Sequence, residues 1–158
     1  MTTGLDVFDT TLQQTNLWLK DLMQRLGTED RRLAYRVLSR TLHAVRDRIG
    51  PANAVHLGAQ LPMLVRGFYY EGWHMAGTPT RERLTEDFLE HVNCHVLRGL
   101  RLDPEKAVRA VFEVMCDKLD PGEIEKVIRV FPPELRNLWP GSRAPVRRER
   151  GTAPAQYL

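Results

Sequence analysis

Cysteine is scarce in this chain of 158 residues, which has only Cys94 and Cys116 and no CxxC pair. Such sparse cysteine is typical of the reducing cytosol, where disulfides are rare. Long apolar runs are also missing, since no uncharged apolar stretch approaches the ~18 residues that a membrane-spanning helix needs. The first residues carry neither the basic nor the apolar segment of a secretory signal. From these absences we expect a cytoplasmic protein with no membrane partner.

The motifs of the common enzyme classes are missing as well. The sequence has no glycine-rich phosphate loop, no GxSxG nucleophile turn and no HExxH pair. Cys94 and Cys116 lie in unlike contexts, and neither has an identifiable base that would activate a thiol nucleophile. No motif therefore supports an enzyme, and we expect neither a cofactor nor a catalytic residue.

Excess positive charge is confined to one end of the chain. Residues 140–158 hold four arginines against the single Glu149, whereas the rest of the chain carries equal numbers of basic and acidic side chains. A nucleic-acid-binding domain instead concentrates basic side chains on its folded surface, because phosphate neutralisation supplies most of the affinity. With no apolar periodicity there, we predict a disordered basic tail over residues 141–158. We expect nucleic acid to bind at most weakly, through Arg143, Arg147, Arg148 and Arg150.

Proline, glycine and apolar spacing divide the rest of the chain into helices. Gly27 and Gly50 follow apolar-periodic segments as stop signals. Asp103-Pro104 and Asp120-Pro121 each pair an N-cap carboxylate with a proline at the first helical position. No window shows the sustained alternation of a β-strand. The sequence therefore predicts an all-α fold of about eight helices, over residues 6–26, 29–49, 51–60, 62–72, 80–98, 104–118, 121–130 and 132–139.

The first of these helices has one apolar face, because its large apolar side chains recur at steps of three, four and seven residues. This face is formed by Leu5, Phe8, Leu12, Leu19, Leu22 and Leu26. Amphipathic spacing of this kind indicates a helix that packs against the rest of the fold.

An internal repeat is visible when the sequence is shifted by 70 residues, which places residues 36–69 on residues 106–139 without a gap. Pro51 then matches Pro121, and Arg66 matches Arg136. A unit of about 70 residues rarely sustains a core alone. We therefore predict two copies of a four-helix unit, residues 6–73 and 80–139, sharing one core about a pseudo-twofold axis within a single domain over 1–140. Further matched pairs are Leu38 with Val108, Leu42 with Phe112, Val45 with Met115, and Tyr69 with Trp139.

Several long segments of the sequence carry a family resemblance: residues 8–16, 34–38, 42–44, 46–48 and 57–73. They resemble the bacterial family known as domain of unknown function 2267. The resemblance covers about residues 6–140 and omits only the basic tail. It implies a small helical bacterial protein built from a repeated unit. It brings no established activity, cofactor or catalytic residue.

The densest group of polar and aromatic side chains lies within the predicted fourth helix and directly after it. Tyrosine, tryptophan and arginine are the residues that dominate protein-binding surfaces, so this group is our candidate binding surface. The alternative is architectural, with the rings filling the seam between the copies and the polar atoms bonded to helix carbonyls. The group consists of Arg66, Tyr69, Tyr70, Glu71, Trp73 and His74.

A weaker candidate is a metal site at Asp87, His91 and His95, which follow one another at helical steps of four. Two imidazoles one turn apart can share a metal ion. Both histidines, however, lie at the margin of an apolar face, and a further ligand must come from elsewhere. We therefore favour boundary histidines bonded to solvent or backbone and expect no metal. His43 matches Glu113 in the second copy, which indicates a tolerant surface position.

Two functional hypotheses follow. The first is a non-enzymatic cytoplasmic interaction or scaffold protein that binds a protein partner or a second copy of itself through the 62–74 surface. The second is a small-molecule binding protein or enzyme with an apolar pocket at the seam between the copies. There Arg66 would hold an anionic group, and Tyr70, Glu71 or His74 would supply polar contacts or proton transfer.

Overall fold

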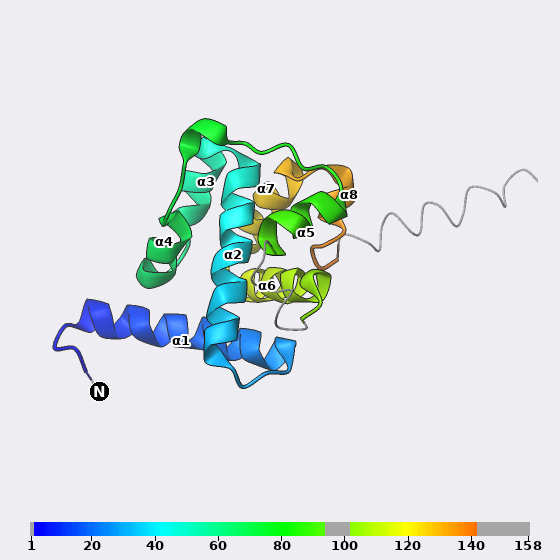
Figure 1. Ribbon diagram of the computed structural model, residues 1–158. Coiled ribbons are helices and arrows are strands. Elements are labelled where there is room, and N and C mark those ends of the chain that lie inside the picture. The colour runs from blue at the N-terminus through cyan, green and yellow to red at the C-terminus, as the bar shows by residue number, and fades with distance from the viewer. Residues whose placement is uncertain (1, 94–101, 142–158) are drawn as a thin grey trace, which may run out of the picture.

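The computed structural model describes residues 2–93 and 102–141. These residues form eight α-helices and one short 3-10 turn, with no strand among them, as the sequence predicts (Figure 1). None of the described helices is long and apolar enough to cross a membrane. The helices are α1 (Asp6–Leu26), α2 (Arg31–Ile49), α3 (Pro51–Gly58), α4 (Met63–Tyr70), α5 (Thr85–Asn93), α6 (Pro104–Lys118), α7 (Pro121–Val130) and α8 (Pro133–Arg136), and the 3-10 turn η1 is Met75–Gly77.

Local capping explains most of the helix boundaries. Asp30, Asp103 and Asp120 each accept a backbone N–H of the helix that they precede, which supplies partners for donors left free in the first turn. Gly27 ends α1 in the left-handed conformation, at φ 70°. The signals at Gly27, Asp103 and Asp120 are those that the sequence predicts, and the structure confirms them, whereas the cap at Asp30 was not predicted.

Helix α2 is the centre of the packing. It runs through the middle of the molecule, with α3 and α4 on one side and α5 on the other (Figure 1). Helix α1 packs against α2 and α4 and then reaches α6. The part of the core contributed by the segments after α4 is aromatic. The ring of Phe112 stacks on that of Trp139 with centroids 3.8 Å apart. The rings of Phe88 and Phe131 pack against this pair at steeper angles.

Several features recur at the 70-residue shift. Helices α3 and α7 both begin at a matched proline, and α4 and α8 begin at matched positions. Arg66 donates hydrogen bonds to the carbonyls of Leu61 and Gly58, and Arg136 donates to the carbonyl of Phe131, the position that matches Leu61. Both guanidinium groups therefore tie the start of one short helix to the end of the preceding one. The pseudo-twofold relation between the two copies stays a prediction.

Helix α5 begins later than the sequence predicted, at Thr85 instead of residue 80. The backbone groups of the residues before it form hydrogen bonds with the end of α2. The N–H of Thr80 donates to the carbonyl of Asp47 at 2.9 Å, and the carbonyl of Glu82 accepts from Arg48 Nε at 2.8 Å. Glu134 of α8 then accepts the N–H of Thr85 and caps the helix. The expected residues 94–98 of this helix lie outside the described residues.

The apolar face predicted for the first helix is only half buried. Leu19 and Leu22 lie in the core, whereas Leu5, Phe8 and Leu12 are 52%, 46% and 40% exposed. The first turns of α1 extend past α2 on the side of α4 (Figure 1), where Thr11 bonds the N–H of Leu64. Apolar periodicity marks a face that avoids water, but it does not reveal where along a helix the covering element stops.

Candidate functional site

The most buried charged group of the described residues is Arg46, in the last turn of α2 and 4% exposed. Its Nη1 donates to the carbonyls of Tyr69 and Glu71 at 2.8 and 3.0 Å, just where α4 ends. Its Nε donates to Asp47 at 2.9 Å, and its guanidinium lies 6.0 Å from the centre of the Trp73 ring. Arg46 therefore supplies the partners that the last carbonyls of α4 would otherwise lack.

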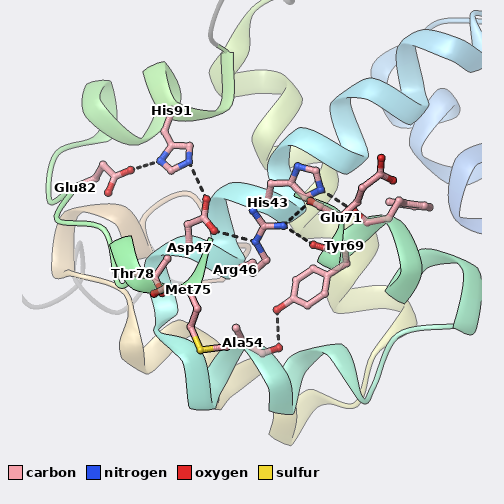
Figure 2. A network of polar contacts seen from close by, with 11 residues as sticks. His43, Arg46, Asp47, Ala54, Tyr69, Glu71, Met75, Thr78, Glu82 and His91 are labelled. Carbon is pink, nitrogen blue, oxygen red and sulfur yellow. Dashed lines mark hydrogen bonds and ion pairs between the residues drawn. The ribbon is translucent and has the colours of Figure 1, made fainter. Parts of the chain in front are cut away.

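Asp47 connects Arg46 to the other side of the molecule. One of its oxygens accepts from Arg46, and the other lies 3.3 Å from Nε2 of His91 on α5. The second ring nitrogen of His91 meets the carboxylate of Glu82, in the segment that precedes α5. Figure 2 shows the chain of contacts from Glu82 through His91 and Asp47 to Arg46 and the carbonyls of α4. We call Arg46, Asp47, Glu82 and His91 the polar network.

The pKa shifts within the polar network favour the charged forms of His91, Asp47 and Glu82. Hydrogen bonding to Asp47, opposed by burial and helped by Glu82, raises the pKa of His91 above its ordinary value of 6.5. Burial works against ionisation of Asp47 and Glu82, but hydrogen bonds from His91 and from Arg46 or Thr80 outweigh it and lower the pKa of both carboxyl groups. An imidazolium between two carboxylates satisfies both ring nitrogens as donors.

These pKa directions predict how the network contributes to stability. Because the pKa of His91 is higher in the folded chain, its contribution is complete below about pH 6.5 and is lost as the pH rises through the folded value. Because the carboxyl pKa values are lower in the folded chain, their contribution is complete above about pH 4.5 and is lost as the pH falls through the folded values. Urea unfolding followed from about pH 2 to pH 9 should therefore show a decline on both sides of that window.

The variant His91→Gln isolates the alkaline side of this profile. It removes the group whose deprotonation causes the loss, so its unfolding free energy should decline less between about pH 6.5 and 8.5 than that of the wild type. His74→Gln is the matched control, since His74 is exposed and makes no contact with the polar network. Equal alkaline slopes in the wild type and in His91→Gln would contradict the assignment.

Two members of the predicted binding surface prove to be internal. Tyr69 is fully buried, and its hydroxyl donates to the carbonyl of Ala54 on α3 at 2.7 Å. Arg66 is half-buried, and its guanidinium group donates hydrogen bonds to carbonyls at and just after the end of α3. Their positions match the architectural alternative, in which rings and guanidinium groups bond to helix carbonyls.

Among the remaining members of that surface, the two aromatic residues Tyr70 and Trp73 pack against each other. The Tyr70 ring stacks on that of Trp73 with centroids 5.6 Å apart, and it lies so close to Gly58 that a β-carbon there would stand 2.2 Å from the tyrosine hydroxyl. Gly58 thus allows α4 to pack closely on α3. Glu71 and His74 are exposed. The six predicted residues therefore do not converge on one pocket.

The structure describes two of the three residues of the weak metal candidate. Asp87 is exposed, whereas His91 turns to Asp47 and Glu82. His95 lies outside the described residues. Over residues 2–93 and 102–141, no group of three or more histidine, cysteine, aspartate or glutamate side chains is arranged to hold a metal ion.

An apolar groove lies between the first half of α1 and α4. It has a volume of about 360 Å³, and apart from the hydroxyls of Thr3 and Thr11 its walls are apolar. The Thr11 hydroxyl accepts the N–H of Leu64 at 2.9 Å and so fixes α4 against α1. We call this the α1/α4 groove; its walls are Thr3, Phe8, Thr11, Leu12, Met63, Leu64 and Gly67.

A second hollow, of about 450 Å³, lies where α1, the α3–α4 turn and the end of α6 meet. It includes Arg66 but none of Tyr70, Glu71 and His74, the polar groups expected beside it. Lys118, at its rim, already pairs with Asp21 and Asp117. Its cations are therefore occupied by the fold itself.

Sequence reasoning missed the polar network because its members are distant in the chain. Arg46 and Asp47 belong to a segment that carried the family resemblance, but nothing in the spacing connects them to Glu82 or His91. His43 was taken for a surface residue, yet it is half-buried and bonds the carbonyl of Phe68 at 2.6 Å. Burial then lowers the pKa of His43, against the effect of that hydrogen bond. The one available signal was the charged triplet 46–48 at the end of an apolar helix.

Fold and site together define an all-helical protein whose buried polar side chains join its helices. The chain belongs to the family described as Uncharacterized conserved protein (DUF2267), whose model matches residues 15–138. This match confirms the resemblance seen in the sequence. Comparison with curated proteins finds no match.

Proposed function

We propose that this chain is a non-enzymatic interaction protein of the cytoplasm that binds a second copy of itself through the α1/α4 groove. The observation that supports this function is the exposed apolar surface around the groove. Phe8, Leu12, Met63 and Leu64 are each 40–47% exposed and line one continuous hollow. Contiguous apolar surface of this kind marks interaction sites, whereas single exposed apolar residues do not.

The groove refines the 62–74 surface expected from the sequence. The exposed part of that segment is the outer face of α4 with Met63, Leu64 and Gly67, and its partner wall comes from α1. A β-carbon built on Gly67 would meet nothing within 4 Å, so this residue leaves open space at the groove. The groove therefore has room for an inserted side chain.

A second copy is the occupant that the chain itself provides. A groove between helices takes an amphipathic helix with apolar anchors at steps of three, four and seven. Leu5, directly before α1, and Phe8 and Leu12 within it form an exposed ridge with these anchors, and Phe8 and Leu12 are also walls of the groove. In a twofold pairing the ridge of each copy would meet the groove of the other, which is the self-complementary arrangement of an isologous dimer.

Sedimentation of the 158-residue chain tests the proposal. The wild type is expected to be a dimer at about 100 µM, and Leu64→Glu should weaken dimerisation by ~100-fold, because each copy would bring an unpaired carboxylate into the apolar contact. Leu84→Glu is the matched control: Leu84 is 52% exposed, precedes α5 and does not border the groove. Its dimerisation should stay within about threefold of the wild type.

A second variant keeps the result independent of introduced charge. Gly67→Leu fills the groove without a clash inside α4, and removing a helical glycine should keep or raise stability by about 0.5–1 kcal/mol. We expect Gly67→Leu to dimerise much more weakly than the wild type. A wild-type chain that stays monomeric at about 100 µM, or a dimer that both groove variants leave intact, would contradict the proposal.

A further inference from the structure

A third hollow, of about 680 Å³, lies between the end of α2 and the segment that joins η1 to α5. Its walls carry three arginines, Arg48, Arg81 and Arg83, and no acidic side chain. The remaining wall is formed by the small or hydroxyl-bearing residues 76–80. Hollows of this size commonly hold small molecules, but a polar, cationic lining does not suit an apolar one.

The side chain of Arg48 is held by a hydrogen bond to the backbone of the segment before α5. Its Nε donates to the carbonyl of Glu82 at 2.8 Å, and no described residue takes a bond from its two terminal amino groups. The side chain is half-buried. Burial lowers the pKa of Arg48, Glu82 opposes this effect, and the like charge of Arg83 adds to it. The guanidinium therefore stands in a partly desolvated place beside a second positive charge.

Arg81 and Arg83 have no carboxylate of their own among the described residues. Neither makes an ion pair or side-chain hydrogen bond there. Between them Glu82 turns the other way, since its carboxylate meets His91. Glu82, the one acidic residue of this segment, thus belongs to the polar network. Its two arginine neighbours at the hollow are left without a counter-ion among the described residues.

The segment that carries these arginines is held by fixed contacts. Thr78 bonds the carbonyl of Met75 through both its hydroxyl and its N–H, at 2.7 and 3.0 Å. The N–H of Thr80 donates to Asp47 of α2. Contacts at residues 78, 80 and 82 anchor the segment on both sides of Arg81, so little further ordering is needed when a ligand binds.

The hollow beside α6 serves as a contrast. Its Arg66 donates to three carbonyls at 2.8–3.4 Å, and its Lys118 has two carboxylates within 4 Å. Those cations already have partners within the fold, whereas Arg48, Arg81 and Arg83 keep open donors at the third hollow. Only the latter arrangement calls for a negative charge from outside the chain.

We propose that Arg48, Arg81 and Arg83 form a binding site for a small molecule that carries a di- or polyphosphate group. Guanidinium groups bind phosphate oxygens through paired N–H donors, and three of them match a ligand with several negative charges better than a single carboxylate. The ligand would also relieve the repulsion between Arg48 and Arg83. This site is separate from the α1/α4 groove, and its test is independent of dimerisation.

Calorimetric titration of the 158-residue chain with inorganic pyrophosphate at constant ionic strength tests the site. We expect saturable binding to one site, weaker binding of inorganic phosphate, and at least a tenfold weaker affinity for pyrophosphate in the double variant Arg81→Gln/Arg83→Gln. Both residues are exposed and make no side-chain contact with other described residues, so the variant should fold normally.

The matched control is Arg32→Gln/Arg36→Gln. It removes the same two charges from exposed positions on α2, and Arg36 lies about 18 Å along the helix from Arg48. Its affinity for pyrophosphate should stay within twofold of the wild type. Equal weakening in the two double variants would show a general charge effect and overturn the proposal, as would the absence of saturable binding.

Phosphate groups also occur on lipids, so a second arm uses vesicles of phosphatidylcholine with phosphatidic acid. If the site takes soluble phosphates, pyrophosphate should bind in the absence of vesicles and release any protein held by them. Retention on vesicles that pyrophosphate does not reverse would contradict the proposal.

Discussion

Arg46→Ala is expected to lower the free energy of unfolding by about 3–5 kcal/mol, the range measured when one partner of a buried charged pair is removed. The variant would leave the carbonyls of Tyr69 and Glu71 without their donor and the Asp47 carboxylate without its neighbouring guanidinium. Buried polar groups left without a partner cost their full desolvation free energy. Since small domains are stable by about 5–15 kcal/mol, this single change removes a large part of the total.

Urea unfolding followed by circular dichroism measures this loss. Arg40→Ala is the control, because Arg40 is an exposed residue of the same helix and its loss should change stability by no more than about 0.5 kcal/mol. Arg46→Lys should fall between the two, since a lysine keeps the charge but not the planar set of donors. Should Arg46→Ala unfold at the same urea concentration as Arg40→Ala, the buried contacts of Arg46 would have no net stabilising role.

Phe112→Ala is expected to cost a similar 3–5 kcal/mol, for a different reason. Phe112 is fully buried, its ring stacks on Trp139, and its ring centre lies 6.4 and 6.1 Å from those of Phe88 and Phe131. Truncation to alanine removes these contacts and leaves a cavity that the surrounding rings cannot fill completely. Thermal or urea unfolding would report the loss directly.

The internal repeat provides the conservative variant for this experiment. Position 112 matches Leu42, a buried leucine of α2, so Phe112→Leu places the residue of the first copy in the second. Leucine keeps most of the apolar volume, and we expect a loss of less than about 1.5 kcal/mol. A loss as large as that of Phe112→Ala would mean that the aromatic stack, and not the filled volume, stabilises this part of the core.

Helix positions were predictable because their signals are local. Asp103 and Asp120 cap the helices that follow them, and Gly27 ends α1, each through contacts within a few residues. The late start of α5 was not predictable in this way, because its cause is the bonding of Thr80 and Glu82 to a helix more than thirty residues earlier. Boundaries set by tertiary contacts have no signature in a local window.

The candidate surfaces show the same division. Arg66 was placed in the candidate binding surface, with an architectural role as the alternative; the structure gives it carbonyl partners within eight residues of it, as it does for the matched Arg136. The exposure of Leu5, Phe8 and Leu12 could not be foreseen, since it depends on how far α1 extends past α2 (Figure 1). The hollow at Arg48 likewise forms only when residues 76–83 fold back on α2. Its arginines are unremarkable in the sequence.

The position of α1 has a consequence for the order of events during synthesis. Its second half packs on α6, and Arg25 pairs with Glu113, which is 88 residues later in the chain. When α1 and α2 leave the ribosome, α1 can meet only its nearer neighbours, and the part of it that packs on α6 lacks this cover until α6 follows. At 5–20 residues per second this interval lasts about 4–18 s. The nascent chain therefore exposes apolar surface on α1 for seconds, a period in which chaperones have access to it.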